Sequence, residues 1–224
     1  MNWQALALTL RLSLITAGSL LVIGLPLAYW VAFSRRRWKF LLQTATSMPL
    51  VMPPTVLGFY ILIAFGSSSP LGRLYQRWTG HTLAFTFTGL VVGSILYSLP
   101  FAVQPLVNAF VSIDPRLIDA SRVLGASRLR TFFRVILPLS ASGIATTIAL
   151  TFAHTFGEFG VVLMVGGDIP GVTRTISIDV FDLVEAGRYG QANITSLVLL
   201  AVSFTVLALV YWWNRRAWPR TPWA

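Results

Sequence analysis

The chain of 224 residues has no cysteine and few charged residues. Without a thiol it excludes disulfide bonds and cysteine chemistry, and it gives no information on the redox state of its compartment. Charged residues make up 11% of the chain, against roughly 25% in soluble domains, and hydrophobic residues make up 55%. Together with a mean hydropathy of +0.73, this composition predicts a polytopic membrane protein.

Catalytic and nucleotide-binding motifs are also missing. The sequence has no GxxxxGK[ST] loop, no HExxH motif, and no Ser-His-Asp set or paired carboxylates inside an apolar run. ATP binding through a phosphate loop is therefore excluded for this chain. A transporter driven by an ion gradient would carry more ionisable residues in its spans. The chain is predicted to be a non-catalytic conduit that takes its energy from a partner.

Five apolar runs are long enough to span a hydrocarbon layer of about 30 Å, which takes about 20 helical residues. The first is not interpreted as a signal peptide, because its basic cluster follows the apolar stretch and no small-residue cleavage site is evident. No linker divides the chain, so residues 1–224 are predicted to form a single transmembrane domain. The predicted spans cover about residues 12–33, 40–66, 83–110, 139–165 and 194–213.

Basic residues are distributed unevenly between the two sides that these spans define. One side carries twelve of the 17 Lys and Arg residues, in residues 35–39, 116–134 and 215–220, and the other side carries five. The positive-inside rule predicts that the N-terminus lies outside and that loop 111–138 and the C-terminus lie in the cytoplasm. Membrane topology thus accounts for the net charge of +10, and no nucleic-acid partner is predicted.

Two spans contain residues that a plain membrane anchor does not need. Three prolines interrupt the second span, and the carbonyl groups that they free need partners in neighbouring helices or in a water-lined cavity. The fourth span contains Glu158, and a carboxylate costs roughly 2.5–3.5 kcal/mol to insert, so it often has a function. The alternative to a role in the transport pathway is that the prolines only kink the second span for helix packing. The predicted gate and pathway residues are Pro53, Pro54, Thr55, Gly157 and Glu158.

Small residues recur at every fourth position of the fourth span, where they would let another helix approach closely. His154 and Glu158 are also four apart, which allows a metal or proton-relay site. With two histidines, no cysteine and no second intramembrane acid, a buried hydrogen bond between spans is preferred, and no metal site is predicted. The alternative is that this spacing of small residues arises by chance in an alanine-rich helix. The predicted packing stripe consists of Ala141, Ala145, Ala149, Ala153 and Gly157.

A basic, patterned segment, DASRVLGASRLRTFFRVILP, occupies residues 119–138 between two apolar runs. Asp114 is a good N-cap, Pro115 suits the first helical position, and Gly125 is a helix stop, which predicts a short helix over residues 115–124. A second helix with apolar residues at helical spacing is predicted up to Pro138. An amphipathic helix lying on lipid is the alternative to a docking element.

This segment resembles the EAA loop of ABC importer permeases, in which E-A-A is followed by a glycine and by a downstream L-P. The departures are an aspartate for the usual glutamate and a serine for the second alanine. The resemblance implies a coupling helix that docks into a cytoplasmic ATPase subunit. The implied docking residues are Asp119, Ala120, Ser121, Gly125, Ala126 and Pro138.

Nearly the whole chain is similar to molybdate ABC transporter permeases, notably in WQALALTLRLSL, PLVMPPTVLGFYIL and GEFGVVLMVGGDIPGVTRTIS. The resemblance implies an all-α, MetI-like permease core with five transmembrane helices in the inner (plasma) membrane. It implies a homodimer with two ATPase subunits, which bind ATP and Mg²⁺, and a periplasmic or extracellular molybdate-binding protein. The chain itself would hold no cofactor. The alternatives are a tungstate or sulfate-type oxyanion as substrate and, in other classes, an unrelated channel or a lipid-handling enzyme.

Overall fold

The computed structural model of the chain describes residues 1–217, and this part is built from helices alone. Three helices are long and apolar enough to cross a membrane, α1 (Trp3–Phe33), α5 (Phe87–Val111) and α12 (Tyr189–Ala217). Two bent pairs of helices also qualify when each pair is taken as one broken span. Four of the five predicted apolar runs overlap the three single helices and the first bent pair, whereas the predicted run 139–165 shares with the second bent pair little more than the helix Ala141–Phe156.

The other helices form the broken spans or connect the spans. The first broken span contains α2 (Lys39–Ser47), η1 (Met48–Leu50) and α3 (Pro54–Phe65), and it bends by 112°. The second contains α7 (Arg128–Thr131), the π-helical η2 (Phe132–Ile136), α8 (Leu137–Leu139) and α9 (Ala141–Phe156), and it bends by 71°. The remaining short helices are α4 (Pro70–Thr79), α6 (Pro115–Val123), α10 (Gly160–Gly166) and α11 (Ile176–Glu185).

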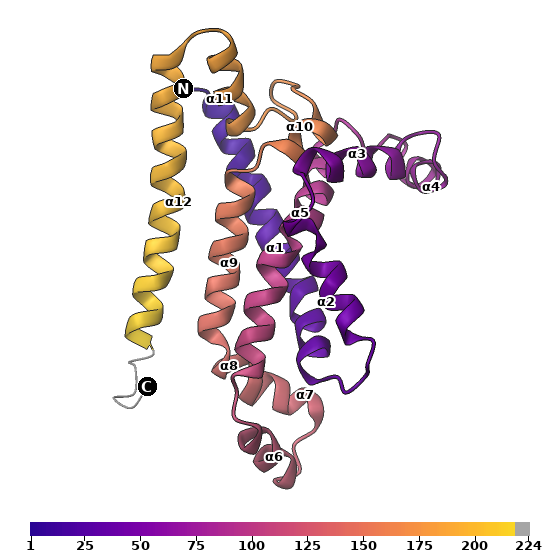
Figure 1. The fold of residues 1–224 in the computed structure, drawn as a ribbon, viewed down its shortest axis with the longest axis vertical. Helices are drawn as coiled ribbons and strands as arrows, with labels where there is room; N and C mark the ends of the chain where they lie inside the picture. The colour runs from indigo at the N-terminus through magenta and orange to yellow at the C-terminus, as the bar shows by residue number, and fades with distance from the viewer. Residues whose placement is uncertain (218–224) are drawn as a thin grey trace.

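Helices α1, α5 and α9 pack together as a central bundle, and α12 lies along α9 at its outer side (Figure 1). Only 6% of the apolar window of α12 is buried within the chain, so this helix presents most of its apolar surface to the membrane. Helices α3 and α4 extend sideways from the bundle, near the end where the N-terminus and α11 lie (Figure 1). Helix α12 and the pair α3 and α4 therefore lie on opposite sides of the bundle (Figure 1).

The basic segments gather at one end of the molecule. The connection between α1 and α2, the helices α6 and α7, and the last turns of α12 all lie at this end (Figure 1). The N-terminus, α10 and α11 lie toward the opposite end. The structure thus separates the two ends as the charge count predicts, although Arg220 lies outside the described residues. The assignment of the basic end to the cytoplasm stays a prediction.

Helix α1 begins well before the predicted start of the first span at residue 12. The side chain of Asn2 caps it by accepting a hydrogen bond from the backbone N–H of Ala5, at 3.1 Å. Arg11 does not end the span, because its guanidinium lies over the ring of Phe87, 4.8 Å from the centroid. An aromatic face attracts a cation, so the charge is accommodated on the side of a helix.

The fourth predicted span, residues 139–165, is not one continuous helix. The chain turns at Ser140, near the start of this predicted span and two residues after Pro138, which has no N–H to continue the hydrogen-bond ladder. Helix α9 ends at Phe156, and Gly157 leaves the helical conformation with φ −93° and ψ 0°. The chain resumes helical structure only at Gly160. The span is therefore interrupted where the sequence places Glu158.

The predicted small-residue stripe lies on α9, except Gly157, which follows the end of the helix. Ala149 is only 2% exposed, so it packs inside the chain, where α9 contacts α1, α5 and α12. The closest approach to α5 is at Gly143, where an added Cβ would overlap that of Ala109. Small residues thus allow close packing within the bundle, whereas Gly157 is exposed and available to another chain.

Candidate functional site

Both ends of α6 are capped, as the sequence predicts. The side chain of Asp114 accepts a hydrogen bond from the backbone N–H of Arg116 at 2.9 Å, and Pro115 occupies the first helical position. At the other end, Gly125 N–H donates to the carbonyl of Arg122 and Ala126 N–H donates to that of Ser121. These two bonds form a Schellman motif. Gly125 has φ +78° with open space around it, so its role is conformational.

Exposed apolar side chains lie at the end of α6 and in the turn after it. Val123 and Leu124 are 87% and 86% exposed, and Leu129 in α7 is exposed as well. Large apolar side chains that gather on an exposed turn indicate a contact surface. Val123 is not among the docking residues predicted from the sequence, because its exposure depends on the turn at Gly125, which presents consecutive residues outward.

Polar side chains tie α6 only lightly to its surroundings. Asp119 and Arg122 lie 3.4 Å apart, but both side chains are more than half exposed, so the pair contributes little stability. The carboxylate of Asp119 is therefore accessible to a partner. Ser121, at the second alanine position of the motif, lies 2.9 Å from the hydroxyl of Thr131 and joins α6 to α7.

The inner surface of α6 is anchored in the bundle. Ile118 belongs to a buried cluster with Ala28 of α1, Leu106 and Phe110 of α5, and Ile136 of η2. Because close-packed interiors transmit displacements, movement of α6 would be passed to α1 and α5. The path to α9 is less direct than the sequence suggests, since the chain turns at Ser140 before α9 begins.

The break before α3 lies next to the break between α9 and α10. Pro53 caps α3 and Pro54 is its first residue, so the proline pair sets the start of α3 after the bend. A Cβ added to Gly160, the first residue of α10, would lie 2.6 Å from the Cβ of Pro54. A Cβ added to Gly58 would lie 2.6 Å from the Cβ of Met164. Glycine on each helix therefore permits close contact between α3 and α10.

The predicted gate residues lie on both sides of this contact. Pro53 and Thr55 are exposed at the start of α3, and Gly157 is exposed at the end of α9. Glu158 is only 6% exposed, and within residues 1–217 its carboxyl group faces the hydroxyl of Ser94 in α5 without a close hydrogen bond. A buried carboxyl group with so little hydrogen bonding is costly, so its retention next to a helix break indicates more than packing.

His154 forms the buried hydrogen bond between spans that was expected for this region. Its Nδ1 lies 2.9 Å from the hydroxyl of Ser98 in α5, and Ser98 also lies 3.0 Å from the hydroxyl of Thr155. The imidazole stacks on Phe101, with 4.0 Å between the ring centroids. The expectation that His154 and Glu158 share one helix face was wrong, because α9 ends at Phe156 between them.

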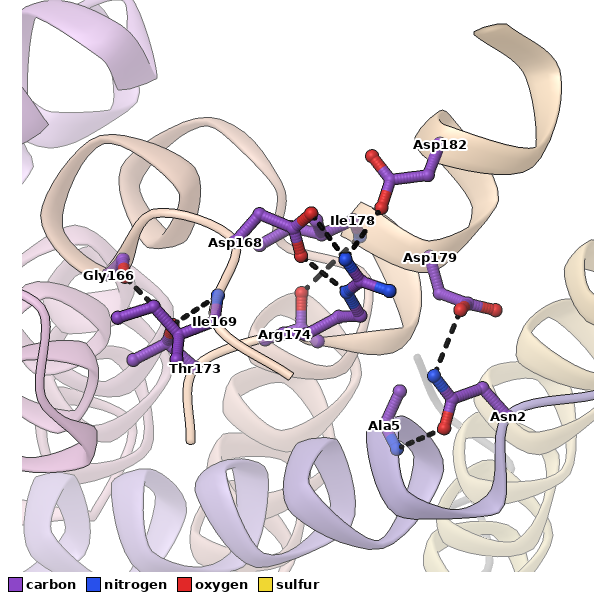
Figure 2. Close-up of polar contacts among 11 residues, drawn as sticks. Asn2, Ala5, Gly166, Asp168, Ile169, Thr173, Arg174, Ile178, Asp179 and Asp182 are labelled. Carbon is purple, nitrogen blue, oxygen red and sulfur yellow. Dashed lines mark hydrogen bonds and ion pairs between the residues drawn. The ribbon is translucent and has the colours of Figure 1, made fainter. Parts of the chain in front are cut away.

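A cluster of ion pairs at the opposite end holds the connection between α10 and α11, as Figure 2 shows. Arg174 donates hydrogen bonds of 2.5 and 2.6 Å to the carboxylate of Asp168, and its guanidinium lies 3.5 Å from Asp182. Asn2 donates a hydrogen bond of 3.0 Å to Asp179, which fastens the start of α1 to α11. This connection is therefore a fixed structure.

Thr173 closes the same connection from inside. Its hydroxyl donates to the carbonyl of Gly166 at 2.8 Å and accepts from the backbone N–H of Ile169 at 3.1 Å (Figure 2). The Gly-rich sequence of residues 166–171 is typical of a turn, but it does not reveal these contacts. Four of the seven acidic residues of the chain fall within residues 168–185, and this concentration of charge was the sequence signal for the ion pairs.

The ion pairs change the titration of the carboxyl groups. The hydrogen bonds from Arg174 lower the pKa of Asp168 below its ordinary value of 3.8. Partial burial, reinforced by the neighbouring Asp168, raises the pKa of Asp182. Arg174 therefore stabilises mainly the charged form of Asp168.

The lowered pKa of Asp168 predicts how the connection responds to acid. Its pairing with Arg174 stabilises the fold fully above the ordinary pKa of 3.8 and is lost as pH falls through the lower folded value. Amide hydrogen exchange of residues 168–174, corrected for intrinsic rates, should be slow at neutral pH and accelerate in that acidic range. Arg174→Ala should exchange rapidly at both pH values, and Arg188→Ala should behave like the wild type. Full protection in Arg174→Ala at neutral pH would contradict this account.

Comparisons with known proteins agree with these features. A family model described as "Binding-protein-dependent transport system inner membrane component" matches residues 24–221. The chain is 49% identical over 207 residues to "Molybdenum transport system permease protein ModB" of Azotobacter vinelandii, covering 92% of each chain. It is 32% identical over 209 residues to the protein of the same name from Escherichia coli K12, covering 93% of this chain and 91% of the relative.

Solved structures share the fold at lower identity. A bacterial ABC transporter involved in the import of the acidic polysaccharide alginate matches with a TM-score of 0.73 and 19% sequence identity. The match covers 95% of this chain and 78% of that chain. At this identity the match shows that the two proteins share a fold, but it does not identify the transported compound.

Proposed function

This chain belongs to the family of inner-membrane components of binding-protein-dependent transport systems, and we propose that it moves molybdate across the membrane. It is a multi-pass inner-membrane permease subunit of an ABC importer. The observation that supports molybdate as the substrate is the 49% identity to a molybdenum permease over 92% of both chains. Tungstate, a closely similar oxyanion, is expected to compete for the same pathway.

The subunit works with partners that supply what the chain lacks. The lack of a phosphate-binding loop supports a non-catalytic permease that holds no cofactor, with ATP and Mg²⁺ on two ATPase subunits. A second copy of the chain completes the conduit on a two-fold axis, because one chain supplies only half of a pathway. A molybdate-binding protein delivers the anion at the end that carries α11.

Coupling begins at α6. The exposed carboxylate of Asp119 and the apolar turn at Val123 and Leu124 fit into a cleft of the ATPase subunit. When ATP closes the ATPase subunits, α6 is displaced, and Ile118 passes the displacement to α1 and α5 through the buried cluster. Helix α9 follows, because α5 and α9 are joined by the hydrogen bonds among Ser98, His154 and Thr155.

Alternating access then acts on the contact between α3 and α10. A change in the tilt of α9 moves Gly157 and Glu158 relative to Pro54 and Thr55, because α10 continues from α9 through the break. Glycines at this contact let the two helices slide without displacing large side chains. No arginine lines this region in residues 1–217, so the anion would bind weakly here and pass through quickly.

Transport by the reconstituted complex tests the proposed function. Proteoliposomes that contain the permease, its ATPase subunit and its binding protein should accumulate labelled molybdate when ATP is supplied. Excess unlabelled tungstate should compete strongly and sulfate weakly. Uptake of sulfate without uptake of molybdate would show that molybdate is not the substrate. Flux that does not depend on ATP would show that the protein is not part of an ATP-driven importer.

The Schellman turn predicts a specific effect at Gly125. Replacement by Trp places a bulky side chain at a positive φ, costing about 1–2 kcal/mol locally, and obstructs the docking surface. Gly125→Trp should insert normally but lose ATPase attachment or uncouple hydrolysis from transport. Gly125→Asn, whose side chain tolerates this conformation, should retain both. A Gly125→Trp complex that assembles and transports like the wild type would remove α6 from the coupling mechanism.

The proposed gate predicts a change in solvent access. Because the chain has no cysteine, Thr55→Cys or Gly157→Cys introduces a unique thiol. Reaction with a membrane-impermeant thiol reagent should change several-fold between nucleotide-free and ATP-bound complexes. Ser68→Cys, in an exposed loop, should react equally in both states. Equal reactivity at Thr55→Cys and Gly157→Cys in every nucleotide state would exclude them from the gate.

A further inference from the structure

A cavity of about 680 Å³ lies at the basic end of the molecule, apart from the proposed gate. It is enclosed by the end of α1 and the segment after it, the end of α5, and α6. Its inner part is apolar and includes Phe33, Phe110 and Ile118. Its rim carries three cationic side chains, those of Arg35, Lys39 and Arg122.

The rim carries an excess of positive charge. Arg122 has Asp119 as a partner at 3.4 Å, and Asp119 also lines the cavity. Arg35 and Lys39 form no ion pair with any carboxylate of residues 1–217. Two unpaired cations at the rim of one cavity attract an anion.

The combination of charge and apolar surface narrows the class of anion. A small, fully hydrated oxyanion gains nothing from a floor of aromatic and aliphatic side chains. A phospholipid has a phosphate for the rim and hydrocarbon for the floor, and basic pockets between transmembrane helices are known to bind such headgroups. The location agrees, because Phe33 is the last residue of a membrane-spanning helix and the basic segment follows it directly.

We propose that this cavity binds the phosphate-bearing headgroup of an anionic membrane phospholipid. The phosphate lies between Arg35 and Lys39, and the first part of an acyl chain contacts Phe33. Since α6 forms one wall of the cavity, the bound lipid supports the position of the docking helix from the membrane side. The proposal does not depend on which oxyanion the importer carries.

Lipid retention by the purified full chain tests the site. Native mass spectrometry would compare retention of phosphatidylglycerol and of zwitterionic phosphatidylcholine by the wild type and by two double variants. Arg35→Gln/Lys39→Gln removes the unpaired charges of the rim. Arg36→Gln/Arg37→Gln removes the same total charge from exposed residues of the same segment that do not line the cavity.

The expected result is that only the variant altered at the cavity loses affinity for the anionic lipid. Affinity for phosphatidylglycerol should fall about 30-fold in Arg35→Gln/Lys39→Gln, from the attraction of two basic residues to an anionic lipid, and should stay near wild type in Arg36→Gln/Arg37→Gln. Phosphatidylcholine, in which the choline charge offsets the phosphate, should bind the wild type more weakly and should lose less affinity than phosphatidylglycerol in Arg35→Gln/Lys39→Gln. Both variants should elute as monodisperse protein, which confirms that they fold.

Other occupants of the cavity would give different results. Equal losses in the two double variants would overturn the proposal in favour of general surface charge. Displacement of phosphatidylglycerol by free molybdate would assign the cavity to a soluble oxyanion. Displacement by the added ATPase subunit would make the cavity part of the subunit interface. Unchanged retention in Arg35→Gln/Lys39→Gln would remove the site altogether.

Discussion

The structure depends on one constraint, which is that a peptide group in the hydrocarbon layer has no water to bind. Each interruption of a membrane-spanning helix must therefore be covered by protein or line a polar cavity. This chain breaks its helices after Leu50, at Ser140 and after Phe156, and it packs α3 and α10, which follow the first and the last of these breaks, against each other. Ile61, Val161 and Val165 form the buried cluster that joins them.

Covering one break with the other places the irregular backbone of both spans in one region. That region also holds Glu158, whose burial with so little hydrogen bonding in residues 1–217 would be wasteful in a static bundle. The opposite end contains rigid elements, a helix capped at both ends and a buried cluster beneath it. The proposed coupling needs a rigid docking element at one end and a contact that can change at the other, and α6 and the contact between α3 and α10 are the candidates for these two roles.

The sequence predicted features whose signals are local. The apolar runs identified the spans, because hydropathy acts residue by residue, and Asp114, Pro115 and Gly125 predicted both ends of α6, because caps depend on neighbouring residues. The prolines after Leu50 predicted a kink in the second span, but not a bend of 112°, since the direction of α3 is set by its packing against α10.

Features that depend on distant residues were missed. The end of α9 at Phe156 escaped the periodicity argument, because small and apolar residues continue through the break at Gly157. The ion pairs of Arg174 with Asp168 and Asp182 need the fold of the connection before α11, and the partner of His154 is 56 residues away in α5. The contact of Arg11 with the ring of Phe87 joins α1 to α5, so the aromatic partner could not be identified from the sequence.

The central claim is that displacement of α6 reaches the spans through Ile118. The most direct measurement is the ratio of molybdate transported to ATP hydrolysed in the reconstituted complex with Ile118→Ala. The account predicts that this ratio falls at least several-fold while the ATPase subunit stays attached. Ile148→Ala, at an exposed position of α9, should keep the wild-type ratio. An unchanged ratio in a folded, assembled Ile118→Ala complex would contradict the account.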